Sequence, residues 1–301
     1  MEPQAELLAR LNRLSLTRSF TPQVDIDWAS ATTEAEYAAL YPAWGLFVGT
    51  GLDARLDDAR RATYVKYQQI NLMLLTACLE RYAVGVLAEL FQRERSEPLA
   101  EYVGHFMKEE IYHDMMFRRA IGLIQASMPG SPPLPGASME RTLRRLFGLI
   151  RSTPGRRLRT VWVFSLLRFV ERVTLFTHQT VQSRIPRRAG LINQVWAFHA
   201  RDEARHVAFD TLVLERNRGG GPLGWLPRAL AISSGVALSL RLNANELWIG
   251  RQVGIRVPRA RLPWLMRRTQ APFKRRIIGM LASLGEGGWE AEKADRAEDE
   301  P

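Results

Sequence analysis

The sequence contains one arrangement of acidic residues and histidines twice. Each copy is an isolated glutamate in an apolar stretch, followed about thirty positions later by a glutamate and a histidine that are three positions apart. The six residues are Glu80, Glu110, His113, Glu171, Glu203 and His206. Residues three or four apart lie on the same face of an α-helix, so each Glu-x-x-His pair can direct both side chains at one point. The repetition predicts that two halves of the chain contribute matching ligands to one site.

Four carboxylates and two imidazoles form a donor set that suits iron or manganese, which bind oxygen and nitrogen ligands. In a four-helix bundle, two Glu-x-x-His pairs and one glutamate from each remaining helix converge on a carboxylate-bridged pair of metal ions. Burying that many acids without a metal would carry a severe desolvation cost. A single Glu-x-x-His is best explained as a chance surface pair. Two copies, each preceded by a glutamate in an apolar helix, indicate a dinuclear site.

A third histidine adds to this set. His199 lies four positions before Glu203, so His199, Glu203 and His206 share one helical stripe. Simple metal storage has no need of a third imidazole, whereas here it would give one metal ion a second nitrogen ligand. The alternative is a core histidine that bonds to a backbone carbonyl, and we favour the ligand.

Glu109 and Asp202 occupy equivalent places, each directly before a ligand glutamate. Histidines that bind metals usually donate their other ring N–H to a carboxylate. The pseudo-symmetry therefore predicts that Asp202 orients His113 and that Glu109 orients His206. The alternative, ordinary solvent-facing acids, is stronger for Glu109 than for Asp202. We identify no catalytic side chain beyond the metal ligands.

Long helices must carry these residues. Sustained helical periodicity covers residues 57–95, 99–128, 139–151, 157–183 and 189–218. Proline and glycine end these segments at Pro98, 129–136, 154–155, Pro186 and 219–222. No window alternates as a strand would. We therefore expect an all-α fold, a ferritin-like four-helix bundle core with additional helices.

We expect residues 1–30, which lack sustained periodicity, to form an N-terminal arm, and residues 31–284 to form a single ferritin-like domain. Within this domain, a helical C-terminal extension begins at about residue 222 and packs on the bundle. Residues 285–301 are polar and acidic, so we expect a disordered tail.

The chain is strongly basic, with 42 Lys and Arg against 31 Asp and Glu and a formal net charge of +11. Such a charge attracts anions, including an anionic substrate. No nucleic-acid motif accompanies it, and aromatic residues do not alternate with basic ones as a stacking platform requires, so we expect no nucleic-acid partner. The single cysteine, Cys78, excludes an internal disulfide framework and a cysteine-based metal site.

The N-terminus lacks the pattern of a secretion signal. The most apolar late stretch, residues 222–240, is interrupted by Arg228 and is too short and mixed for a membrane span. We therefore expect a cytoplasmic protein without a membrane span.

Nine basic residues gather near the C-terminus among apolar and aromatic ones. They are Arg251, Arg256, Arg259, Arg261, Arg267, Arg268, Lys274, Arg275 and Arg276. We favour a solvated segment whose apolar face packs on the bundle. Two alternatives stay open: a surface that docks an acidic acyl or peptidyl carrier protein bearing the substrate, and a helix that lies on a membrane surface.

With these motifs in hand, the chain resembles the p-aminobenzoate N-oxygenase family of diiron enzymes over roughly residues 35–250. The order of the ligands and the additional His199 match that family better than ferritins, rubrerythrins or ribonucleotide reductase small subunits. The resemblance implies a homodimer with two iron ions that cycle between Fe2+ and Fe3+, with manganese as the alternative metal. It also implies dioxygen as co-substrate and an external electron donor.

The resemblance further assigns roles to the ligands. It implies that Glu80 and His113 serve one iron and that Glu110 and Glu203 bridge the two. The other iron would then be served by Glu171, His199 and His206.

Three functions are compatible with such a centre. Members of the family oxidise amines, notably arylamines, to hydroxylamine, nitroso or nitro products in secondary metabolism, and we favour this function. The alternative is a diiron hydroxylase or desaturase that acts on a C–H bond of a free or carrier-bound small molecule. A non-catalytic metal-binding protein is disfavoured because it would not need the third imidazole of His199. A radical-generating subunit is disfavoured because Tyr82 and Tyr112 point away from the ligands.

Overall fold

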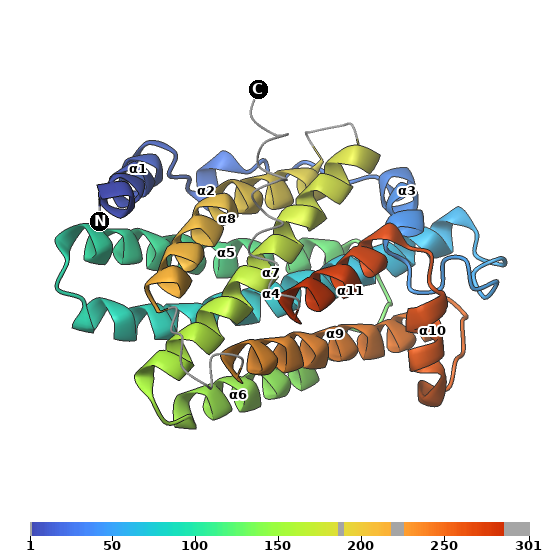
Figure 1. The fold of residues 1–301 in the computed structure, drawn as a ribbon. Coiled ribbons are helices and arrows are strands. Elements are labelled where there is room, and N and C mark those ends of the chain that lie inside the picture. Colours follow the sequence, from blue (N-terminus) through green and yellow to red (C-terminus); the bar gives the residue numbers. More distant parts are fainter. Residues whose placement is uncertain (1, 186–189, 218–225, 286–301) are drawn as a thin grey trace.

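A computed structural model describes residues 2–185, 190–217 and 226–285 of the chain (Figure 1). These residues form helices and connecting segments, and no strand occurs among them. The prediction of an all-α fold is confirmed for this part of the chain. The sequence break at 219–222 and the acidic tail beyond Gly285 lie outside the described residues.

Four long helices form the bundle that carries the ligands. They are α4 (Asp58–Arg93), α5 (Glu97–Ala126), α7 (Arg156–Arg184) and α8 (Leu191–Arg216). Their ends follow local chemistry. Asp57 caps α4 by accepting a hydrogen bond from the backbone N–H of Arg60 at 2.9 Å. Gly155, with φ +86°, adopts the left-handed conformation directly before α7, which is favourable for glycine.

The helices pair in chain order. The α4 helix packs against α5, and α7 packs against α8, each pair being joined by a short connection. A longer connection links the two pairs and contains α6 (Ala137–Ser152), which packs on α4 and α7. This arrangement brings the two copies of the carboxylate–histidine pattern face to face across the bundle.

Residues 1–30 contain two helices, α1 (Glu2–Thr17) and α2 (Pro22–Asp25), although their sequence lacks sustained periodicity. Leu8 and Leu11, three positions apart, are buried, and α1 packs against α5 and α8. The α1 helix therefore covers one side of the bundle. Its stripe of buried apolar residues is too short to give a clear periodicity in the sequence.

The C-terminal segment also packs on the bundle. It contains α9 (Leu226–Gln252), the 3-10 helix η1 (Arg259–Arg261), α10 (Leu262–Arg268) and α11 (Pro272–Gly285). The α9 helix lies against α7 and α4, and α11 contacts α9, α7 and α3 (Glu34–Trp44). A buried carboxylate, that of Glu246, ties these elements together. It accepts hydrogen bonds from the backbone N–H of Leu46 at 3.2 Å and from the side chains of Tyr64 and Lys274.

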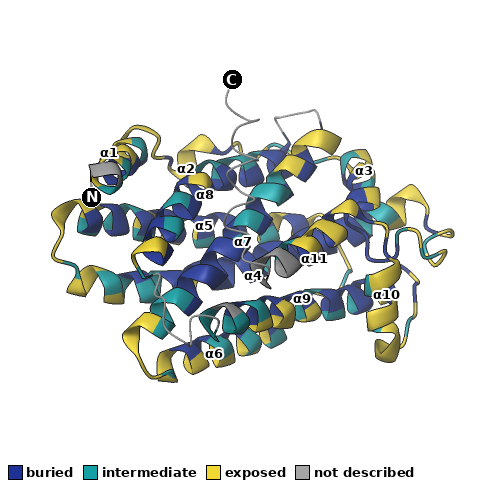
Figure 2. Cartoon of the chain, in the orientation of Figure 1, coloured by how far each residue is buried: buried dark blue, intermediate teal, exposed yellow. Residues whose placement is uncertain are grey.

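The buried residues lie mainly on the faces that the long helices turn toward one another, and the exposed residues lie on the outer faces (Figure 2). By length and composition alone α4 is apolar enough to cross a membrane, but 67% of its most apolar window is buried within the protein. Such burial is typical of the core helix of a soluble protein.

Candidate metal centre

All nine residues predicted for the site are buried in the middle of the bundle. The side chains of His113, His199 and His206 have no exposed surface. The predicted ligands come from all four long helices: Glu80 from α4, Glu110 and His113 from α5, Glu171 from α7, and His199, Glu203 and His206 from α8.

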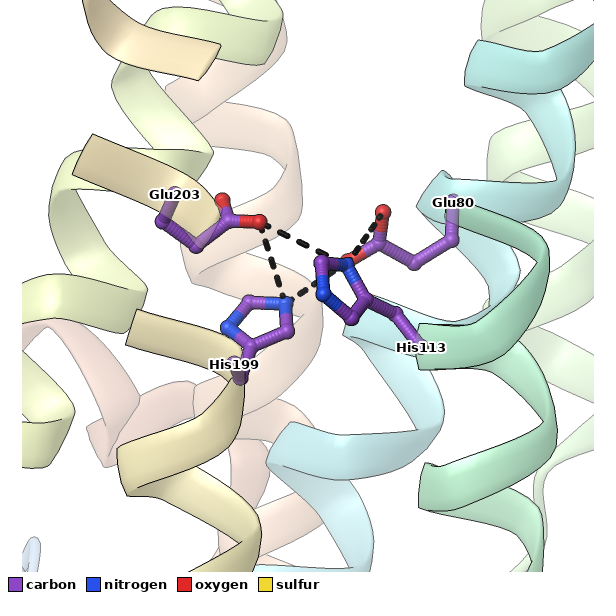
Figure 3. A group of neighbouring side chains, drawn as sticks. All are labelled: Glu80, His113, His199 and Glu203. Carbon is purple, nitrogen blue, oxygen red and sulfur yellow. Dashed lines mark hydrogen bonds and ion pairs between the residues drawn. The ribbon is translucent and has the colours of Figure 1, made fainter. Parts of the chain in front are cut away.

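One group of donor atoms is formed by Glu80, His113, His199 and Glu203 (Figure 3). One donor atom from each residue lies within 4.8 Å of those of the other three. Nε2 of His199 lies 2.9 Å from Oε1 of Glu80 and 3.4 Å from Oε1 of Glu203. Nδ1 of His113 lies 3.6 Å from the same oxygen of Glu203. This geometry suits a metal ion held by two carboxylates and two imidazoles.

A second group contains Glu110, His113, Glu203 and His206. Nδ1 of His206 lies 3.1 Å from Oε1 of Glu110 and 3.2 Å from Oε1 of Glu203. Two residues, His113 and Glu203, belong to both groups. Overlapping groups of this kind can hold two metal ions side by side, with a shared carboxylate between them.

Glu171 lies outside both groups but beside the second. Its carboxyl is fully buried, and the neighbouring charges of Asp210, Glu203 and His206 act on it. Burial first, and then the charge of Asp210, raises the pKa of Glu171 well above its usual range. The buried carboxyl group of Asp210 therefore disfavours the ionised form of Glu171 when no metal is bound.

Asp210 was not predicted as a site residue. It is fully buried, and its pKa is also raised well above the usual range, chiefly by burial. The sequence does contain a signal for it, because Asp210 lies four positions after His206 on the stripe that carries His199 and Glu203.

The position of His199 differs from the grouping that the family resemblance implies. Its Nε2 lies next to Glu80, which belongs to the first donor group, rather than next to Glu171 and His206. The physical reason is distance along α8. His199 and His206 are two helical turns apart, which separates them by about 10 Å along the helix axis.

The two outer acids lie against the imidazoles with which the pseudo-symmetry paired them. Oδ2 of Asp202 lies 3.3 Å from Nε2 of His113, and Oε2 of Glu109 lies 2.9 Å from Nε2 of His206. When each Nε2–H donates to its carboxylate, Nδ1 of each ring presents its lone pair to the centre. His199 is different: its Nε2 faces the centre, and its Nδ1 has no hydrogen-bond partner among the described residues.

Arg205 joins the two outer acids, and the sequence analysis missed it. Its Nη2 lies 2.7 Å from Oε1 of Glu109 and 2.7 Å from Oδ1 of Asp202. Burial raises the pKa of Glu109, but the hydrogen bond and charge of His206, followed by those of Arg205, lower it to about 2. Arg205 lies three positions after Asp202, so helical spacing alone could have suggested this contact.

The pKa values of the three imidazoles are shifted in different directions when no metal is bound. Burial lowers the pKa of His113, but the hydrogen bond to Asp202 and the charges of nearby carboxylates outweigh it, so the pKa is raised. The same balance, with Glu109 as the first partner, raises the pKa of His206 well above its usual range. Burial and the charges of the other two histidines lower the pKa of His199 well below it.

Buried polar atoms without hydrogen-bond partners also indicate that this donor set binds metal ions. Several buried polar atoms have no hydrogen-bond partner among the described residues: Oε2 of Glu110, Nδ1 of His113, Oε2 of Glu171 and Nδ1 of His199. Unsatisfied buried acceptors are costly, and metal ions at the centre would satisfy those that face it. Oxygen and nitrogen donors in this ratio match iron or manganese.

Aromatic rings close the site on the α5 side. Phe106 stacks on His206 with ring centroids 3.7 Å apart, and the ring of Phe117 lies 4.8 Å from that of His199. Tyr102, also missed in the sequence, has a buried hydroxyl without a hydrogen-bond partner among the described residues, and the charge of His206 acts on it. Tyr82 stacks instead on Phe147, at 4.7 Å between centroids.

Comparison with known proteins gives three findings. The sequence model of the family described as P-aminobenzoate N-oxygenase AurF matches residues 2–247 of the chain. Two curated relatives, uncharacterized protein Mb0909 of Mycobacterium bovis and uncharacterized protein Rv0885 of Mycobacterium tuberculosis, are 26% identical over 208 residues. The match covers 68% of this chain and 58% of each relative, so the chain spans well under two thirds of their length.

The solved structures that match include several of an R2-like ligand-binding oxidase. One, with an aerobically reconstituted Mn/Fe cofactor (long soak), has a TM-score of 0.56 at 13% identity and covers 94% of this chain and 92% of its own. A mutant of the oxidase with an anaerobically reconstituted Mn/Fe cofactor has a TM-score of 0.55 at 14% identity over the same shares. At this identity the likeness concerns the fold alone, and it confirms the prediction of a ferritin-like bundle.

Proposed function

The chain belongs to the P-aminobenzoate N-oxygenase AurF family, and we propose that it is an oxygen-dependent oxidoreductase that oxidises the nitrogen of an aromatic amine. The products would be a hydroxylamine, a nitroso compound or a nitro compound. The resemblance noted in the sequence is thus confirmed at the level of the family. The identity of the substrate is what we propose here.

The observation that carries the proposal is the combination of His199 with two overlapping donor groups. Metal storage requires carboxylates and open sites, and it gains nothing from a third buried imidazole. Here His199 directs its Nε2 to Glu80 at 2.9 Å and places a nitrogen donor in the first group. A fixed nitrogen ligand favours redox chemistry at a retained metal ion over release of that ion.

We propose that the seven predicted ligands hold two iron ions, with manganese as the alternative metal. The first position is served by Glu80, His113 and His199, and the second by Glu110, Glu171 and His206, with Glu203 facing both. Bound iron would supply the electrons and open coordination positions that dioxygen activation requires. An external electron donor restores the reduced state between turnovers.

The residues around the ligands have separate tasks. Glu109 and Asp202 hold the Nε2 protons of His206 and His113, so that both Nδ1 lone pairs face the centre. Arg205 pairs with both outer acids and contributes to the lowered pKa of Glu109. The phenyl rings of Phe106 and Phe117 exclude water from the histidines, which strengthens the electrostatic interactions inside the site.

The side chains between α4 and α7 favour an apolar substrate. A narrow crevice there is lined mainly by apolar side chains such as Leu72, Phe169 and Val173, together with Thr76 and Thr174, and no ionisable side chain lines it. Thr76 lies one turn before Glu80, and Thr174 lies one turn after Glu171. The crevice has a volume of about 20 Å³, so an aromatic ring enters only when these side chains move.

The decisive experiment is turnover of the iron-loaded protein with a reductant and a panel of substrates. The panel pairs arylamines with matched compounds in which a methyl group replaces the amino group. We expect oxygen consumption and a mass gain on nitrogen for the amines only. Oxidation of the methyl compounds at comparable rates would favour the alternative, a hydroxylase acting on C–H bonds. The homodimer and the cytoplasmic location are further parts of the proposal, and a carrier-bound substrate is an alternative to a free one.

A further inference from the structure

A second cavity lies away from the metal centre. It has a volume of about 360 Å³ and is enclosed by α9, the segment around η1 and the connection that leads into α6. In Figure 1, α6 lies along the same side as α9, and α10 stands at the end of α9. Volumes of this size are usual for small-molecule sites. None of the predicted metal ligands lines the cavity.

Three arginines line this cavity without a counter-charge. Arg241 and Arg251 project from α9, and Arg259 belongs to η1. None of the lining residues is acidic, and no ion pair with Asp or Glu is formed by these three arginines within the described part of the chain. Like charges that converge in this way repel one another, and an anion between them would relieve the repulsion.

Arg241 is held in place by neutral partners. Its Nη2 donates hydrogen bonds to Oγ of Ser138 and, at 2.9 Å, to Oδ1 of Asn245. Its Nε is buried and has no hydrogen-bond partner in the described residues. Burial, followed by the charges of Arg259 and Arg141, lowers the pKa of Arg241. The guanidinium of Arg241 is therefore held in place, has no acidic partner in the part of the chain that is described, and keeps its Nε–H available as a hydrogen-bond donor.

The indole of Trp248 forms an apolar wall of the cavity and is also held in place by its neighbours. Trp248 lines it and packs edge-on against Tyr67, with ring centroids 5.2 Å apart. The hydroxyl of Tyr67 donates to the backbone oxygen of Pro132 at 2.7 Å, which anchors the connection that carries Pro135, another lining residue. An indole beside three guanidinium groups offers a planar apolar surface next to a strong anion site.

We propose that this cavity binds a small molecule that carries a phosphate group and an apolar ring. Arg241, Arg251 and Arg259 bind the phosphate, because guanidinium groups donate paired hydrogen bonds to phosphate oxygens. The ring lies against Trp248. This site and its ligand are independent of the amine-oxidising activity.

The cavity is too far from the metals to be part of their site. Asn245, which lines it, donates a hydrogen bond to Oδ1 of Asn71 at 2.7 Å. Asn71 precedes Glu80 by nine residues in α4, which corresponds to about 13 Å along the helix axis. A phosphate bound by the arginines therefore does not reach the metal ligands.

The test is calorimetric titration of the iron-loaded protein with phenyl phosphate and with inorganic phosphate, in a buffer free of other anions. We expect one molecule of phenyl phosphate per chain. The double variant Arg241→Gln/Arg259→Gln should weaken both probes by about tenfold or more. Trp248→Ala should weaken phenyl phosphate several-fold and leave inorganic phosphate unchanged.

Two controls make the result decisive. The double variant Arg267→Gln/Arg268→Gln removes the same charge from exposed positions outside the cavity and should leave the affinity unchanged. Protein stripped of its metal should bind phenyl phosphate as the loaded protein does. Arg259→Gln alone, an exposed single change, keeps the test valid if the Arg241 variant fails to fold. Equal weakening by both double variants, dependence on the metal, or no saturable binding would overturn the proposal.

Discussion

Oε2 of Glu109 lies 2.9 Å from Nε2 of His206, on the side of the ring that faces away from the centre. The same relationship holds at 3.3 Å between Asp202 and His113 in the other half of the chain. Each contact holds the ring proton on Nε2 and directs Nδ1 to the donor groups. The two halves of the site are therefore built in the same way. On both α5 and α8, the acid directly before the ligand glutamate orients the histidine of the opposite helix.

Asp202→Asn should weaken metal binding or activity by about 10–100-fold, the usual loss when such a carboxylate is removed. The change preserves volume but removes the charge that holds His113 in place. Metal affinity of the variant is measured by competition with a chelator. Asp114→Asn, which alters an acid outside the site that pairs with Arg81 and Arg118, serves as the control. Wild-type affinity in Asp202→Asn would show that the contact does not position the ligand.

Arg205→Met should leave two buried acids, Glu109 and Asp202, without their shared cation. The lowered pKa of Glu109 would then rise, because Arg205 is one of its causes. A carboxylate with a raised pKa takes up its proton at a higher pH, so the variant should lose metal on acidification at a higher pH than the wild type. Arg118→Met, an exposed change, is the control. An unchanged pH profile of metal retention would contradict this role.

Metal uptake should release protons and become tighter as the pH rises. The pKa values of His113 and His206 are raised above the usual value of 6.5, so both rings keep their second proton to a higher pH than a free imidazole does, and a metal that binds Nδ1 must displace that proton. Ionisation of Glu171, whose pKa is raised well above its usual range, should add to this release. Anaerobic titration with Fe2+ in two buffers of different ionisation enthalpy measures the released protons. Uptake without proton release would mean that the imidazoles are not ligands.

His199→Ala should keep the bundle folded and retain much of the metal, yet lose most oxidative turnover. Its Nδ1 lacks an orienting acceptor among the described residues, and the first donor group retains Glu80, His113 and Glu203 without it. Steady-state oxygen consumption and metal content are measured together. His105→Ala, which removes a histidine outside the two donor groups, is the matched control. Unchanged turnover in His199→Ala would make His199 a core residue only.

The sequence was sufficient to predict the long helices, because strong periodicity and proline or glycine breaks coincide at their ends. The members of both donor groups are among the residues that the sequence indicated, since Glu-x-x-His spacing and its repetition do not depend on tertiary detail, whereas Glu171 lies outside both groups. The sequence could not place His199 beside Glu80, because that contact depends on how α8 and α4 are aligned along their lengths. Arg205 and Asp210 lie on α8 at helical spacing from predicted residues, but their contacts with Glu109 and Glu171 depend on the packing of α8 against α5 and α7.

The most direct test of the whole account is the metal content of the folded protein produced with ample iron. Two ions per chain are expected, because His113 and Glu203 each belong to both donor groups and so allow two adjacent metal positions. Glu203→Ala should reduce the content of both ions, because Glu203 belongs to both donor groups, and Glu110→Ala should do the same if Glu110 bridges the ions as the family resemblance implies. A folded, iron-supplied wild-type protein that retains at most one tightly bound ion would contradict the dinuclear centre.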